Sequence, residues 1–235
     1  MTEARVALVT GGTRGIGEAI ARRLVAEGFT VFISGRTEES VRKALARFAA
    51  DGLAIRGFAA DARREADQKR LVESVAREAG RLDVLVNNAG IGHFAPVDEL
   101  DPEKFREVVE TNLFGPFYAV HHAAPLMRKN GGGFVVNVAS LASVNPFAGG
   151  AAYNASKFGL LGFSEAAMLD LRHGGIRMAT VLPGSVATEF GHSRGDAAWM
   201  LAPEDVAEAV ADLVRFPGRA IASRIDLRPS RPPKK

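Results

Sequence analysis

The chain has 235 residues, of which 47% are hydrophobic and 24% charged, so it can bury one large core. The absence of cysteine excludes disulfide scaffolds, zinc–cysteine sites and thiol chemistry, and it fits a reducing cytoplasm. The last eight residues, Arg-Pro-Ser-Arg-Pro-Pro-Lys-Lys, carry four positive charges and no acid, which more than accounts for the net charge of +3. No apolar run approaches the roughly 18 residues of a membrane span. We therefore predict a cytoplasmic protein with a basic tail at residues 228–235 and with no membrane or nucleic-acid partner.

Short runs rich in Val, Leu and Ile alternate with amphipathic stretches along the whole chain. Strands are predicted at Arg5–Thr10, Thr30–Ser34, Leu53–Ala60, Leu82–Val86, Gly133–Ala139, Ile176–Leu182 and Ala220–Leu227. Helices are predicted at Gly15–Gly28, Glu38–Asp51, Glu65–Gly80, Pro102–Lys129, Ala151–His173 and Pro203–Phe216. This alternation predicts an α/β fold: one Rossmann-like, doubly wound, seven-stranded parallel sheet with helices on both faces. We expect a single domain over residues 1–227.

A glycine-rich segment connects the first predicted strand to the first predicted helix. Its glycines at positions 11, 15 and 17 have the spacing G-x-x-x-G-x-G. Glycines let a backbone turn tightly and approach a pyrophosphate, and the free N–H groups of a helix start attract the anion. An ordinary glycine-rich turn is the alternative. If the segment is a phosphate loop, the expected cofactor contacts are Gly11, Thr13, Arg14, Gly15, Ile16 and Gly17.

The residue that follows the second strand distinguishes two nicotinamide cofactors. A site for NAD would place a carboxylate there to accept the ribose hydroxyls, whereas this chain has Arg36. A guanidinium favours the additional phosphate of NADP, and Arg14 could provide a second one. Glu38 and Glu39 are rival candidates for a contact with NAD, but acids are expected in the first turn of any helix. We therefore predict NADP(H) in preference to NAD(H).

Asp61 ends the third predicted strand, at the carboxyl edge of the sheet where ligands collect. Its carboxylate could accept a hydrogen bond from the adenine amino group. It could equally cap the helix that begins near Arg63. Both interpretations stay open at this point.

Tyr153 and Lys157 lie four residues apart near the start of a predicted helix and so share one helix face. An ammonium about 5 Å from a phenol stabilises the phenolate by about 3 kcal/mol at an effective dielectric constant of about 20. We therefore expect Lys157 to lower the pKa of Tyr153 towards neutrality. An exposed Tyr–Lys pair with no function is the alternative.

Several motifs occur in this chain in a characteristic order: the glycine segment, Asn87-Asn88-Ala89-Gly90 after the fourth strand, Asn112, Ser140 and the Tyr153–Lys157 pair. In order and spacing, the chain resembles the short-chain dehydrogenase/reductase superfamily over roughly residues 5 to 227. The resemblance implies that Tyr153 is the general acid or base and that Ser140 orients the substrate carbonyl. It also implies that Lys157 holds the nicotinamide ribose and that Asn112 supports a water in a proton relay.

The resemblance implies further cofactor contacts and an assembly. The adenosine side would be lined by Asn88, Ala89 and Gly90, and the nicotinamide side by Pro183, Gly184, Val186 and Thr188, with Asp61, Tyr153 and Lys157 also in contact. Members of this superfamily commonly form tetramers, so a homo-oligomer, a dimer or a tetramer, is expected through residues 102–129 and 151–173. Pro116 lacks the N–H that would bond to the Asn112 carbonyl, so we expect the helix to kink there and to free that carbonyl for water.

The best functional prediction is an NADP(H)-dependent oxidoreductase that acts on a small carbonyl or alcohol substrate. A 3-oxoacyl-carrier-protein reductase is the first alternative, although the last strand and the tail lack the glycine-rich ending usual in those enzymes. An NADP-binding sensor without catalysis is the second. No metal site is expected, because the five histidines show no ligand spacing. Apolar side chains predicted on loops at the catalytic edge could form a substrate pocket: Phe94, Leu141, Val144, Phe147, Phe190, Trp199 and Met200.

Overall fold

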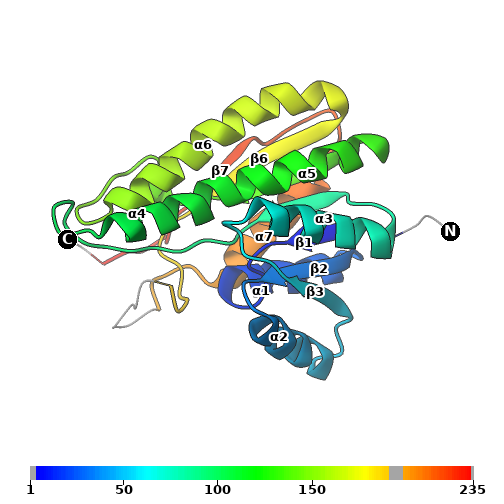
Figure 1. Ribbon diagram of the computed structural model, residues 1–235, viewed down its shortest axis with the longest axis horizontal. Helices are drawn as coiled ribbons and strands as arrows, with labels where there is room; N and C mark the ends of the chain where they lie inside the picture. The colour runs from blue at the N-terminus through cyan, green and yellow to red at the C-terminus, as the bar shows by residue number, and fades with distance from the viewer. Residues whose placement is uncertain (1–3, 191–197, 234–235) are drawn as a thin grey trace.

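The strands of this protein are short apolar segments that pair in one parallel sheet. The structure, a computed structural model, describes residues 4–190 and 198–233 (Figure 1). The sheet order is β3-β2-β1-β4-β5-β6-β7. The strands are β1 (Val6–Val9), β2 (Thr30–Gly35), β3 (Ile55–Ala59), β4 (Val84–Asn87), β5 (Gly133–Val138), β6 (Ile176–Pro183) and β7 (Arg224–Leu227). The predicted Rossmann-like, doubly wound α/β fold is confirmed.

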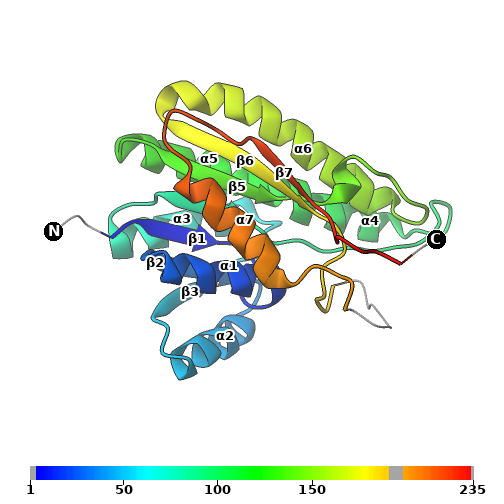
Figure 2. The ribbon, with the colours of Figure 1, turned by 180° about the vertical axis from the view of Figure 1, so that it is seen from behind.

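Helices cover both faces of the sheet, which explains why the central strands are apolar on both sides. One face is covered by α1 (Gly15–Ala26), α2 (Glu38–Ala50) and α7 (Pro203–Arg215) (Figure 2). The other is covered by α3 (Glu65–Ala79), α5 (Gly115–Lys129) and α6 (Ala151–Leu171). Because every strand is parallel, the carboxyl ends of all seven lie at one edge, and the loops that carry the predicted site begin there.

Three strands, β3, β4 and β7, start at least two residues later than the sequence pattern predicted. Leu53 belongs to the turn that ends α2, because its N–H donates to the Phe48 carbonyl over 2.8 Å. Ala220 is likewise held in a turn, by a bond of 2.9 Å from its N–H to the Pro217 carbonyl. Apolar side chains extend each pattern towards the amino end, but the backbone of these residues is already bonded within turns.

The predicted single helix 102–129 is divided into α4 (Pro102–Val109), a π-helical turn (Glu110–Phe114) and α5. The N–H of Gly115 donates to the Glu110 carbonyl, five residues back, and the next residue, Pro116, has no N–H. A β-carbon on Gly115 would lie 3.0 Å from the Ala62 carbonyl oxygen, so glycine lets the helix approach the end of β3. The break is therefore confirmed and takes the form of a π-helical turn, while the free Asn112 carbonyl stays a prediction.

The start of the C-terminal tail packs against the sheet. The N–H of Gly184 donates to the Leu227 carbonyl over 2.8 Å, and Pro229 lies 3.1 Å from the position of a β-carbon on Gly184. Residues 230–233 are exposed. Over residues 4–190 and 198–233, no helix is long and apolar enough to cross a membrane.

Candidate active site

The glycine segment forms a tight loop between β1 and α1. Gly11 and Gly15 have φ angles of 63° and 55°, in the left-handed region that favours glycine. A β-carbon on Gly17 would lie 2.2 Å from the Gly11 carbonyl oxygen and 2.4 Å from Nδ2 of Asn88. Glycine at position 17 therefore lets the first turn of α1 close onto the loop, as a phosphate cradle requires.

Asn88, after β4, braces this loop from the neighbouring strand. Its Nδ2 donates to the carbonyls of Thr10 and Gly11, each over 3.1 Å. Its N–H and that of Ala89 donate to Oγ1 of Thr10, over 3.1 Å and 3.2 Å. The sequence placed Asn88 at the adenosine, whereas its side chain holds the glycine loop. Arg47 of α2 adds a support that sequence reasoning missed, a 2.6 Å bond to the Thr13 carbonyl.

The two arginines predicted to bind the additional phosphate lie at the carboxyl edge, and each has an acidic partner. Arg14 is paired with Glu189 over 2.7 Å, and both side chains are largely exposed. Arg36 lies 4.0 Å from Glu107 of α4 and is also exposed. Exposed ion pairs contribute little to stability, so both guanidinium groups can turn towards an anionic ligand at small cost.

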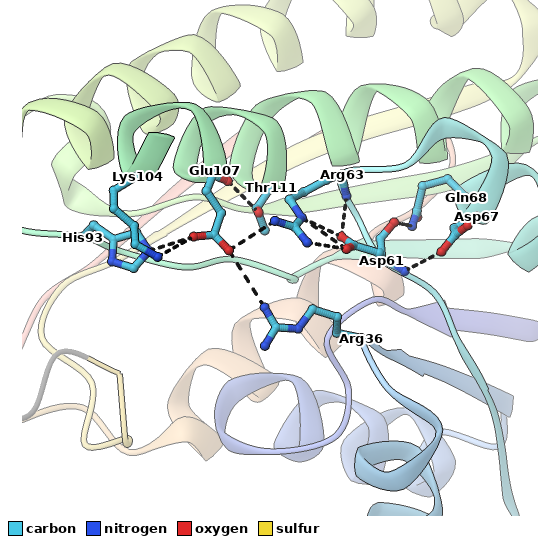
Figure 3. Close-up of polar contacts among 9 residues, drawn as sticks. All are labelled: Arg36, Asp61, Arg63, Asp67, Gln68, His93, Lys104, Glu107 and Thr111. Atoms are coloured by element: carbon cyan, nitrogen blue, oxygen red, sulfur yellow. Dashed lines mark hydrogen bonds and ion pairs between the residues drawn. The ribbon is translucent and has the colours of Figure 1, made fainter. Parts of the chain in front are cut away.

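Asp61 forms a local turn with Arg63 (Figure 3). Its carboxylate accepts the Arg63 N–H over 3.0 Å and the Arg63 guanidinium over 2.6 Å. These bonds hold the pKa of Asp61 below its usual range, and its carboxylate stays ionised. The predicted helix cap is not found, because Arg64 is the N-cap residue of α3 and its side chain makes no capping hydrogen bond. Asp61 instead holds the turn that precedes α3, and a contact with adenine stays a prediction.

Glu107 joins several elements at this edge, and sequence reasoning missed it. Its carboxylate accepts Arg63 over 3.2 Å, His93 over 3.2 Å and Lys104 over 3.3 Å (Figure 3). Burial opposes its ionisation, but the hydrogen bonds from His93 and Lys104 hold its pKa below the usual value. No local signal could have revealed this role, since Arg63 is 44 residues away in the sequence.

Ser140, Tyr153 and Lys157 come together where β5 ends. Lys157 is only 4% exposed, and its Nζ donates to the carbonyl of Val138, the last residue of β5, over 3.1 Å. The same Nζ lies 5.7 Å from the centre of the Tyr153 ring, and Ser140 is hydrogen-bonded to the Tyr153 side chain. The structure therefore brings together three of the four residues predicted to act in catalysis.

Asn112, the fourth, lies in the π-helical turn and fastens the loop after β4. Its Oδ1 accepts the Ile91 N–H, and its Nδ2 donates to the Ile91 carbonyl, each over 2.9 Å. Nδ2 also donates to Oγ of Ser156, over 3.0 Å. A β-carbon on Gly90 would lie 3.3 Å from Oδ1 of Asn112 and 3.7 Å from Nζ of Lys157, so both border the same residue.

The expected lowering of the Tyr153 pKa is not found. Burial raises the pKa of Tyr153, and the hydrogen bond from Ser140 only partly opposes this effect. Burial also lowers the pKa of Lys157 to about 8. The prediction was wrong because it considered only the attraction between the ammonium and the phenolate. In the structure both charged forms lose hydration, which raises the pKa of Tyr153 and lowers that of Lys157.

The segment after β6 completes the edge. Pro183 ends β6, Val186 pairs with Leu201, and the Thr188 N–H donates to the Val186 carbonyl over 2.9 Å. A β-carbon on Gly15 would lie 3.4 Å from the Thr188 methyl group. The residues predicted for the nicotinamide side thus lie directly beside the glycine loop. Within the described parts of the chain, no group of three or more His, Asp or Glu could hold a metal ion.

Comparisons with known proteins agree with this geometry. A sequence model of the short chain dehydrogenase family matches residues 5–199. The chain belongs to the short-chain dehydrogenase family. As a member of this family, it is an oxidoreductase that acts on alcohols and carbonyl compounds with a nicotinamide cofactor.

Three members of the family illustrate the similarity. D-threitol dehydrogenase from Mycolicibacterium smegmatis is 36% identical over 206 residues, which cover 86% of this chain and 79% of the relative. An alcohol dehydrogenase from the archaeon Thermococcus sibiricus, solved with 5-hydroxy-NADP, has a TM-score of 0.89 and 27% identity over 99% of this chain and 100% of that one. The actinorhodin polyketide ketoreductase with NADPH has a TM-score of 0.89 and 34% identity over 97% of both chains.

The low pKa of Lys157 makes stability depend on pH. Since the folded state lowers this pKa from 10.5 to about 8, burial of the charge costs most below pH 8, and the cost falls as pH rises towards 10.5. Relative to Lys157→Met, the wild type should gain about 2 kcal/mol of unfolding free energy between about pH 7 and about pH 9.5. Urea unfolding at several pH values measures this difference. Lys129→Met, a substitution at an exposed position, serves as the control. If the difference in unfolding free energy between the wild type and Lys157→Met does not change over this pH range, Lys157 is not a buried group that titrates there.

Proposed function

We propose that this protein is an NADP(H)-dependent reductase that transfers hydride between the nicotinamide and a carbonyl or secondary alcohol, with Tyr153 as general acid or base. The observation that carries the proposal is the grouping of Ser140, Tyr153 and Lys157 at the edge where the glycine loop lies. The titratable side chains have shifted pKa values and share one site, as catalytic groups do. The sensor alternative does not require this set.

The residues at the edge fit a nicotinamide dinucleotide. Gly11, Gly15 and Gly17, which have no side chains, lie in the loop at the N-terminus of α1, where N–H groups bind phosphate. Thr13, Arg14 and Ile16 belong to the same loop, and the exposed Arg36 would bind the additional phosphate of NADP. Ala89 and Gly90 would contact the adenosine side of the cofactor, and Pro183, Gly184, Val186 and Thr188 would contact its nicotinamide side. When bound, the nicotinamide supplies or accepts the hydride.

Tyr153 is suited to donate a proton to a carbonyl oxygen. With its raised pKa the phenol is protonated at neutral pH, the form that can donate a proton to a carbonyl oxygen. Ser140, already hydrogen-bonded to the phenol, would hold the carbonyl oxygen beside it. The Lys157 ammonium, with a pKa of about 8, remains mostly protonated at neutral pH and can donate to ribose hydroxyls. Asn112 positions the loop that borders Lys157.

A 3-oxoacyl reductase remains the second candidate. The observation that favours it is the 34% identity to a polyketide ketoreductase. A panel of simple ketones and 3-oxoacyl thioesters, assayed with both reduced cofactors, separates the two candidates. The cytoplasmic location, the single domain over residues 1–227 and the separate tail stay predictions.

Tyr153→Phe tests the proposed acid. The substitution removes the proton donor and keeps the ring, so kcat should fall by about 100-fold or more while NADPH affinity changes little. Steady-state rates with a ketone substrate and fluorescence titration with NADPH measure the two quantities. Tyr118→Phe alters the other tyrosine of the chain and provides the control. Turnover that survives in Tyr153→Phe rules out this role.

Arg36→Asp tests the cofactor preference. The wild type should prefer NADPH. In the variant, the new carboxylate should repel the additional phosphate and accept the ribose hydroxyls of NADH instead. The ratio of kcat/KM for NADPH to that for NADH should therefore fall by about 100-fold. Arg42→Asp reverses an exposed charge on the neighbouring helix and controls for net charge. A wild type that prefers NADH defeats the proposal.

We also propose that two copies associate through α4–α5 and α6, which lie side by side (Figure 1). This face exposes Phe114, Phe117, Phe158 and Leu169, each more than two-fifths exposed. Large apolar side chains exposed on neighbouring helices are typical of a surface that a second copy covers. Sedimentation should show a dimer or tetramer that dissociates in Phe117→Asp and persists in Phe216→Asp, and a monomeric wild type contradicts the proposal.

A further inference from the structure

Two phenylalanine rings contact the ring of Tyr153, and a third contacts one of these two. Phe94 and Phe190 each lie 5.7 Å from it, centre to centre, and Phe147 lies 5.9 Å from Phe94. Phe94 and Phe190 also contact each other, over 6.5 Å. Despite these contacts, Phe94, Phe147 and Phe190 are 46%, 47% and 44% exposed. An apolar group half open to water beside a reactive side chain is typical of a ligand-binding wall.

The three phenylalanines lie on different loops, and hydrogen bonds from backbone N–H groups fasten each of these loops. The Ala95 N–H donates to the Gly149 carbonyl over 3.0 Å, which fastens the loop of Phe94 to the loop of Phe147. The Phe147 N–H donates to Oδ1 of Asn154, the helical neighbour of Tyr153, over 3.3 Å. Phe190 donates its N–H to Oγ1 of Thr188 over 3.2 Å. The rings are therefore positioned by the backbone rather than by chance contact.

Gly92 makes room for two of these rings. A β-carbon there would lie 2.6 Å from Phe94 and 3.1 Å from Phe190. Any side chain at this position would push the rings away from Tyr153. The absence of a side chain at position 92 thus keeps the aromatic wall close to the phenol.

The ring planes leave aromatic faces uncovered. The angle between planes is 64° for Phe94 and Tyr153, 85° for Phe94 and Phe190, and 46° for Tyr153 and Phe190. None of these pairs is stacked face to face. A further flat ring can therefore add to the cluster by an offset or edge-to-face contact, the arrangements that aromatic pairs prefer.

We propose that Phe94, Phe147 and Phe190 select the substrate, and that the site takes ketones with a flat aromatic group next to the carbonyl. This inference rests on the proposed function and specifies its substrate class. With its oxygen at the Tyr153 hydroxyl, such a ketone places its aromatic group against the wall. A hydroxylated ketone would leave several hydroxyl groups against ring carbons without hydrogen-bond partners, which costs binding free energy.

Three ketones and a set of variants test the proposal. Acetophenone is the aromatic probe, cyclohexyl methyl ketone matches it in size without being flat, and erythrulose is the hydroxylated probe. With the wild type, kcat/KM should be at least about ten-fold higher for acetophenone than for erythrulose, with cyclohexyl methyl ketone between them. In Phe94→Ala and Phe190→Ala, the ratio of kcat/KM for acetophenone to that for erythrulose should fall by at least about ten-fold.

Two further sets of variants separate recognition from folding. Phe94→Leu and Phe190→Leu keep an apolar side chain and lose the aromatic face, so they should lower the preference for acetophenone over cyclohexyl methyl ketone while the melting temperature holds. Phe216→Ala removes a similarly exposed ring (42%) outside the cluster and should leave all three ratios unchanged. Equal losses on all three ketones would show that the rings only pack against Tyr153 and would overturn the inference. A wild-type preference for erythrulose would overturn it as well.

Ligand binding keeps this test separate from that of the proposed function. Saturation-transfer NMR reports whether the aromatic protons of acetophenone contact the protein without any turnover. If no ketone is reduced with NADPH or NADH, the proposed function fails, and the binding signal decides the inference. If the wild type gives a saturation-transfer signal for acetophenone and Phe94→Ala and Phe190→Ala lose it, the inference is upheld. If the wild type gives no signal, or the variants keep it unchanged, the inference is overturned.

Discussion

The burial of Lys157 is the constraint on which the rest of the site depends. An ammonium that is 4% exposed has lost nearly all of its hydration and needs acceptors from the protein or from a ligand. One acceptor is the Val138 carbonyl, which lies at the end of β5 and so fixes the position of α6 along the sheet. The lowered pKa of about 8 shows that this single bond does not fully replace water. Ribose hydroxyls would provide further acceptors, so cofactor binding and the charge on Lys157 should support each other.

The parallel sheet determines which loops can reach this lysine. Each strand contributes its carboxyl end to the same edge, so loops far apart in the sequence meet there: the glycine loop after β1, Asn88 after β4, Ser140 after β5 and Thr188 after β6. Contacts within the edge then fix the loops. Thr10 and Asn88 link β1 to β4, Asn112 links the loop after β4 to Ser156 of α6, and Glu107 links the ends of β2 and β3 to α4. Charged and polar bonds therefore join the loops of this edge, beside the small apolar cluster of Ala139, Leu160 and Leu182.

The sequence predicts those features that depend on neighbouring residues. The tight loop at Gly11 and the close approach of Gly17 follow from local sterics, and the sheet follows from the alternation of apolar runs with amphipathic ones. The break near Pro116 follows from a missing N–H, although its π-helical form depends on the approach to Ala62. In contrast, the partners Glu107 and Glu189 of the two arginines are distant in the sequence and belong to helical or loop segments that show no pattern. The pKa of Tyr153 could not be predicted either, because it depends on burial, which follows from the tertiary packing around the phenol and not from neighbouring residues.

The raised pKa of Tyr153 and the aromatic wall have one physical origin. Burial raises the pKa of the phenol, and Phe94 and Phe190, whose rings lie against the Tyr153 ring, present apolar faces on the same side of the site. A phenol that stays protonated is a proton donor, and half-exposed apolar rings beside it offer a substrate few hydrogen-bond partners beyond those of its carbonyl oxygen. Lowering the pKa of Tyr153 by hydration would require an open site, which would also weaken the binding of an apolar substrate. The protonated form of Tyr153 and the proposed preference for an apolar substrate therefore both depend on how much water reaches the phenol.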